Sequence, residues 1–78
     1  DEEGERLLRA RDVDGLHRFG HTAKGSFLQF GYPEGGAIGE ALLRCARDGD
    51  WEGAASEVAA LRRLLTDVRE ALARRHAR

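Results

Sequence analysis

Residues 16–30 read LHRFGHTAKGSFLQF, and this stretch decides the fold. On an α-helix with about 100° of rotation per residue, its apolar and small residues fall within a stripe about 100° wide. The residues of this stripe are Leu16, Phe19, Gly20, Ala23, Phe27 and Phe30. A stripe of that width is typical of a helix that packs on a core. The pattern therefore predicts an amphipathic helix whose aromatic rings face inward.

His21 lies on the opposite, solvent-facing side of this predicted helix, about 150° from the centre of the apolar stripe. His17 precedes it by one turn, and Lys24 and Gly25 come one turn after it. Residues at these spacings are neighbours on a helix surface. Lys24 is the single lysine of the chain, and a lysine provides a compact, mobile charge with three hydrogen-bond donors. The arrangement indicates a surface site that meets an anion.

Residues 21–26 resemble the active helix of histidine-containing phosphotransfer domains, the HPt modules of bacterial phosphorelays, whose signature runs approximately H-x-L-K-G-S. The chain reads HTAKGS, with Ala23 where the family usually has leucine. Residues 30–34 (FGYPE) and 48–51 (DGDW) are similar to two later turns of the family. The resemblance covers most of the chain. It implies a helical bundle that accepts and donates a phosphoryl group.

By this resemblance, His21 is the expected phospho-acceptor. An exposed imidazole has an unprotonated ring nitrogen near neutral pH without special tuning. Lys24 is expected to offset the charge of roughly −1.5 to −2 that a phosphoryl group adds. Gly25, which has no side chain, is expected to leave room for an incoming partner. The residues expected to contact that partner are His17, Arg18 and Leu28.

The resemblance also implies what the partner brings. A response-regulator receiver domain would supply the phospho-aspartate and a magnesium ion, and a hybrid sensor histidine kinase is a further partner that the resemblance allows. We expect no cofactor and no metal in this chain, and a phosphocarrier rather than an enzyme. His17 and His21 have the spacing of a zinc-binding pair, but the sequence offers no evident third ligand.

The composition excludes several other classes of protein. The chain has 78 residues, 13 basic against 14 acidic, for a formal net charge of −1, so we expect neither nucleic acid nor a membrane surface as a partner. No apolar run reaches the roughly 18 residues of a membrane span. Cys45 is alone and cannot form an internal disulfide. We expect a cytoplasmic domain. Because no methionine begins the chain, we also expect either a domain excised from a longer protein or a chain trimmed at its start.

The remaining pattern predicts an all-α fold, an antiparallel up-down-up-down four-helix bundle that forms a single domain over residues 1–78. We expect the helices at roughly 2–11, 14–30, 35–48 and 51–75. The second begins after Asp12 or Asp14 as N-cap and ends at Gly31, and the third ends at Gly49. Short connections favour antiparallel neighbours. The fourth helix is much the longest, so its far end is expected to extend beyond the others.

The glycines at positions 35, 36 and 39 of the third predicted helix have two possible explanations. Each glycine costs about 1 kcal/mol relative to alanine in a helix interior. They either allow close approach of a neighbouring helix or leave a first turn that frays easily, and we favour close approach.

Three alternatives to phosphotransfer stay open. A pseudo-HPt module would dock a partner without being phosphorylated, and a structural segment would dimerise through the long helix. An enzyme has little support, because one histidine is accompanied by neither a nucleotide-binding loop nor an acid/base partner. The sequence specifies neither the direction of phosphate flow nor the identity of the receiver.

Overall fold

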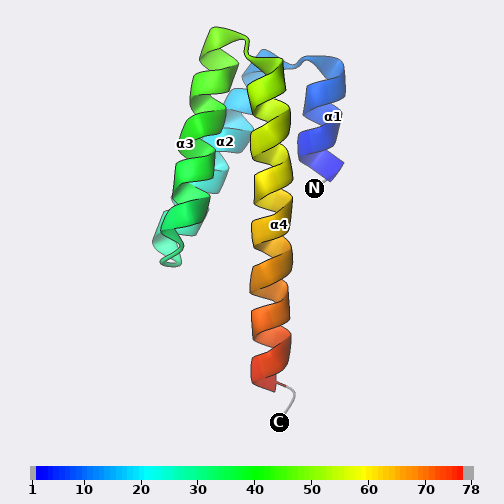
Figure 1. Ribbon diagram of the computed structural model, residues 1–78. Coiled ribbons are helices and arrows are strands. Elements are labelled where there is room, and N and C mark those ends of the chain that lie inside the picture. The colour runs from blue at the N-terminus through cyan, green and yellow to red at the C-terminus, as the bar shows by residue number, and fades with distance from the viewer. Residues whose placement is uncertain (1, 77–78) are drawn as a thin grey trace.

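The computed structural model describes residues 2–76, with side chains over residues 2–75, and it is entirely helical in that range apart from short turns. The helices are α1 (Glu2–Ala10), α2 (Val13–Gln29), α3 (Pro33–Asp48) and α4 (Trp51–His76). They run alternately up and down in one bundle (Figure 1). The expected all-α four-helix bundle is therefore confirmed. The expected helix bounds agree to within two residues at each end.

The turns at the helix ends have the expected chemistry. Asp12 is the N-cap of α2, and its Oδ1 accepts a hydrogen bond of 2.9 Å from the Gly15 backbone nitrogen. Asp50 accepts a hydrogen bond of 2.9 Å from the Gly53 nitrogen at the start of α4. Gly31 and Gly49 have φ values of 81° and 68°, the left-handed conformation that terminates a helix. These turns place α2 antiparallel to α3, and α3 antiparallel to α4.

The core lies in the half of the bundle where all of the helices run side by side. Its largest fully buried side chains are Leu16 and Leu42, each 0% exposed, in α2 and α3. The other buried apolar residues are Leu7, Ala46, Ala54, Val58 and Leu61. Helix α2 packs on α3, α3 packs on α4, and the short α1 packs on both α2 and α4. The core thus fixes α2, the helix that carries the candidate site, from its inner side.

The glycines of α3 let it approach α2 closely. A Cβ atom built on Gly39 would stand 2.5 Å from the Lys24 backbone nitrogen, and one on Gly20 would stand 3.0 Å from the Gly39 carbonyl oxygen. A Cβ on Gly35 would overlap the Phe27 ring. These distances leave no space for side chains at the seam. The structure therefore favours the packing interpretation of these glycines.

Helix α4 extends well beyond the other helices, as expected (Figure 1). Its 26 residues correspond to about 39 Å, against about 26 Å for the 17 residues of α2. Because α1 has only 9 residues, it covers just the first part of α4, where Gly4 packs on Val58 and Glu5 pairs with Arg62 at 2.7 Å.

The prediction that Phe30 faces the core is wrong, since its side chain is 73% exposed. Phe30 follows the last residue of α2 as its C-cap, at the end of the bundle away from the α1–α2 turn, and the nine residues of α1 do not extend to this level. It lines an open apolar groove with Phe27 and Tyr32, across from Leu65, Val68 and Leu72 of α4. The two aromatic rings within α2, Phe19 and Phe27, are partly buried.

Between residues 2 and 76, none of the helices combines the length and the apolar character that crossing a membrane requires.

Candidate functional site

The outer face of α2 presents His21 to solvent. His21 and His17, one turn earlier, are both exposed. The two histidines differ in the residue that follows each of them one turn later on the helix. Gly20, three residues after His17, is buried against α3, whereas Lys24, three residues after His21, carries a charge that reaches the surface. Of the two histidines of α2, only His21 therefore combines an exposed imidazole with a cation one turn further along the helix.

Gly25 is exposed, and a Cβ atom built on it would have nothing within 4 Å. It differs in this from the glycines at the α2–α3 seam, where a Cβ would overlap a neighbour. A glycine within a helix is less favourable than alanine by about 1 kcal/mol, and no packing contact explains its presence here. The open position beside His21 is consistent with access for a large reactant.

Lys24 lies at the edge of α2 that borders α3. Its Nζ is 2.5 Å from Oε2 of Glu40, and the two side chains are 39% and 47% exposed. The hydrogen bond from Lys24, together with the charge of the ammonium, lowers the pKa of the Glu40 carboxyl below its ordinary value. The predicted phosphate-binding lysine thus has a carboxylate partner in this state. The helical pattern of the sequence does not indicate Glu40 as part of the site.

The residues expected to contact a partner occupy both borders of the His21 face. Leu28 lies on the α3 side, where a Cβ on Gly36 would stand 2.6 Å from its Cδ2, yet it remains 53% exposed. Arg18 lies on the α1 side and lines a shallow cavity together with Glu3. His21 therefore projects between two borders formed by neighbouring helices.

In a comparison with protein families, the model of the Hpt domain matches residues 2–71. The chain belongs to the Hpt domain family. The matched range includes α1, α2, α3 and most of α4, so the whole bundle around His21 is part of the Hpt domain. Hpt domains carry phosphoryl groups on histidine within phosphorelays and are phosphocarriers rather than enzymes. A search of curated proteins finds no match, and a search of solved structures finds none.

The described part of this Hpt domain contains no group of three or more His, Cys, Asp or Glu side chains arranged to bind a metal. His17 and His21 accordingly gain no third ligand from the residues that the structure describes. Cys45, the remaining soft donor, is partly buried beside Gly53, and burial raises the pKa of its thiol.

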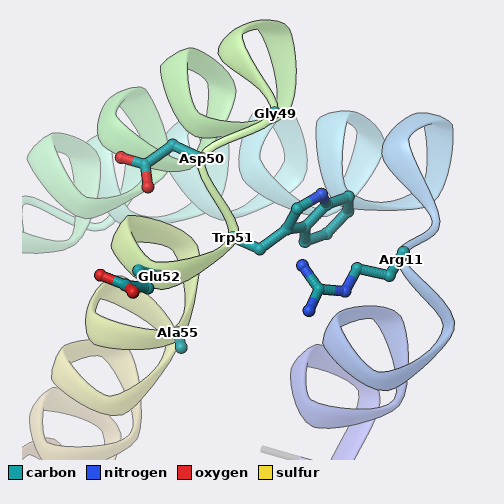
Figure 2. A pocket seen from close by; sticks show the side chains of 6 residues that line it. All are labelled: Arg11, Gly49, Asp50, Trp51, Glu52 and Ala55. Carbon is teal, nitrogen blue, oxygen red and sulfur yellow. The ribbon is translucent and has the colours of Figure 1, made fainter.

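A further open cavity lies where the α3–α4 turn meets the end of α1 (Figure 2). The Arg11 guanidinium lies over the Trp51 ring at 5.5 Å from its centroid, within the range of a cation–π contact. Arg11 has a φ of 52°, the left-handed conformation, and its backbone nitrogen bonds to the Leu8 carbonyl oxygen at 3.2 Å. The contact joins the end of α1 to the start of α4, and neither residue is on the face of α2 that carries His21.

Glu40 was missed because its pairing with Lys24 joins two helices. The spacing between them in the sequence carries no periodic signal that would reveal the contact. Gly39 was the available clue, since a glycine in a helix interior indicates close approach of a neighbour. The residue after such a glycine lies at the border of that contact, where a charged side chain can reach across.

Proposed function

We propose that His21 is the phospho-acceptor of this Hpt domain and that it exchanges a phosphoryl group with the aspartate of a response-regulator receiver domain. The observation that carries the proposal is the exposed imidazole of His21 beside the open position at Gly25, with a lysine three residues on. The other histidine of α2 has no comparable neighbours. The third histidine, His76, lies outside the range matched by the family.

The reaction requires one unprotonated ring nitrogen of His21. That nitrogen attacks the phosphorus of the aspartyl phosphate, so that an N–P bond forms while the P–O bond to the aspartate breaks. The electron pair leaves with the aspartate carboxylate, and the proton on the other ring nitrogen passes to solvent. The reverse sequence transfers the phosphoryl group to the next aspartate in the relay.

The residues around His21 would assist this exchange in different ways. Lys24 would offset the charge of roughly −1.5 to −2 on the transferred group. Gly25 would let the receiver approach, and Leu28, a large exposed apolar side chain, would be covered by it together with His17 and Arg18. The magnesium ion of the reaction would belong to the receiver, and this chain would bind no cofactor of its own.

The deciding experiment is transfer of radiolabelled phosphate from phosphorylated receivers of the source organism to the domain and to its His21→Gln variant. Acid-labile, alkali-stable label on the wild type and on a His17→Gln control, but not on His21→Gln, is the expected result. Label that persists in His21→Gln would refute the assignment.

The same samples separate the alternative roles. Receiver binding that survives His21→Ala, without any phosphohistidine in the folded wild type, would indicate a pseudo-HPt docking module. A stable dimer in sedimentation experiments, with no affinity for receivers, would indicate a dimerisation segment.

A further inference from the structure

The Lys24–Glu40 ion pair sets a carboxylate against the cation that the proposed reaction uses. Lys24 lies three residues after His21, a spacing that places Cβ atoms about 5–6 Å apart on a helix. The distance of 2.5 Å between Lys24 Nζ and Glu40 Oε2 shows that this ammonium already has an anionic partner. A phosphoryl group on His21 would be a second anion within reach of the same ammonium.

The backbone fixes this arrangement. Because the Gly39 backbone lies directly against Lys24, the next residue, Glu40, is positioned at the border of α2. Both side chains are partly exposed, so the pair can open without uncovering buried charge. An exposed ion pair of this kind is worth little in stability. Its effect is therefore expected on the charge near His21 rather than on the fold.

We propose that Glu40 is a positioning residue that competes with the phosphoryl group on His21 for the Lys24 ammonium and so limits the stability of the phosphohistidine. This inference rests on His21 being the phospho-acceptor. In the unphosphorylated domain Glu40 keeps the ammonium at the α2–α3 border. In the phosphorylated domain its carboxylate draws Lys24 away and repels the phosphoryl group, so transfer onward to an aspartate becomes more favourable.

Two arginines of α3 remain near the Glu40 carboxylate when Lys24 moves away, and their positive charges stabilise it. Arg44 and Arg47 come one and two turns after Glu40, and their positive charges also contribute to lowering the pKa of its carboxyl. Glu40 therefore keeps favourable charge neighbours when Lys24 moves toward the phosphoryl group. When Lys24 moves from Glu40 to the phosphoryl group, both the carboxylate and the ammonium therefore still have a neighbour of opposite charge.

The test uses Glu40→Gln, which keeps the size of the side chain and removes its charge. Phosphohistidine is formed with phosphoramidate or with phosphorylated receivers, and its lifetime and its equilibrium with the receiver are measured. Removing a unit charge at roughly 6–8 Å in a solvated setting should lengthen the lifetime and shift the equilibrium toward the Hpt domain by about two- to fivefold. Glu70→Gln, in the last third of α4, is the matched control for net charge and should change neither quantity.

The double variant Lys24→Ala/Glu40→Gln tests whether Glu40 acts through Lys24. If Glu40 acts through Lys24, Glu40→Gln should have a smaller effect in the Lys24→Ala background than in the wild type, because only direct repulsion remains. Equal effects in both backgrounds would overturn competition for Lys24. An unchanged lifetime in Glu40→Gln would overturn the inference as a whole.

Failure of this inference differs from failure of the proposed function. Labelled His21 with a lifetime that Glu40→Gln does not alter would reject the inference alone, whereas an unlabelled wild type would reject the proposed function and the inference with it. The pair itself is checked without phosphorylation by measuring the titration of the Glu40 carboxyl by NMR. Its pKa should rise in Lys24→Ala, and an unchanged pKa would show that the pair does not form.

Discussion

The backbone of Gly39 in α3 lies directly against the backbone of Lys24 in α2. A Cβ atom at position 39 would stand 2.5 Å from the Lys24 nitrogen and 2.7 Å from the Lys24 Cα. Backbone atoms cannot move aside as the end of a flexible side chain can. This contact therefore sets both the separation of the two helices and the register that brings Glu40 to Lys24.

Replacing Gly39 with alanine should separate α2 from α3. The added methyl group has no space, and overpacking of this kind destabilises a protein by about 1–3 kcal/mol. This loss exceeds the stability gained from the higher helix propensity of alanine. Urea denaturation of the variant should show a lower midpoint, and phosphotransfer should slow because Lys24 is displaced. A Gly39→Ala domain as stable as the wild type would contradict the close approach.

Gly25 should respond in the opposite way, since it faces open space. Gly25→Ala should stabilise the domain by about 0.5–1 kcal/mol, the usual gain for an exposed position within a helix. Gly25→Gln should keep the fold but slow transfer from receivers, because its side chain would occupy the approach to His21. Circular dichroism and label-transfer rates check the two parts separately, and fast transfer in Gly25→Gln would remove the proposed role in access.

The helical pattern was sufficient to predict most of the fold. Helix ends were predictable because local chemistry determines them: Asp12 and Asp50 cap helices, and Gly31 and Gly49 adopt left-handed φ values. The buried positions of Leu16 and Leu42 are predictable from periodicity alone. These features depend on residues within one or two turns of each other in the sequence.

Contacts between helices were less predictable. Phe30 continues the apolar stripe of α2 as the C-cap of that helix, but its exposure depends on how far α1 extends along the bundle, which the periodicity of α2 does not specify. Glu40 meets Lys24 only because α2 and α3 pack in one particular register. Within the site, the sequence could indicate His21, Lys24 and Gly25, while the carboxylate that pairs with Lys24 required the structure.

The difference between a buried apolar residue of α2 and the exposed apolar residue at its C-cap should appear in stability measurements. Leu16→Ala should destabilise the domain by about 2–5 kcal/mol, because Leu16 is fully buried in the core. Phe30→Ala should change the free energy of unfolding by no more than about 0.5 kcal/mol, as expected for a surface position. Thermal unfolding of both variants checks this, and a large loss in Phe30→Ala would mean that its ring is covered in solution.

Cys45 should react slowly with thiol-alkylating reagents in the folded domain. Burial raises the pKa of its thiol, with the carboxylates of Asp50 and Glu57 adding to the effect, so the reactive thiolate is scarce at neutral pH. The rate should increase only as the pH rises above the ordinary range for cysteine. The denatured chain provides the reference, and equal rates in folded and denatured protein would contradict the prediction.

The Lys24–Glu40 pair should make stability depend on pH in a defined direction. Because the folded-state pKa of Glu40 is lowered, the pair contributes stability above the ordinary glutamate pKa of about 4.3, and this contribution is lost as the pH falls through the folded-state value. Lys24→Ala should therefore be slightly less stable than the wild type at neutral pH, by the small amount expected for an exposed ion pair, and the difference should disappear in acid.

Urea denaturation of both proteins at a series of pH values measures this difference. In a Glu40→Gln background the effect of Lys24→Ala should no longer depend on pH in this range, because the titrating carboxyl is gone. A difference between wild type and Lys24→Ala that stays constant down to strongly acidic pH would mean that Lys24 stabilises the domain through some contact other than Glu40.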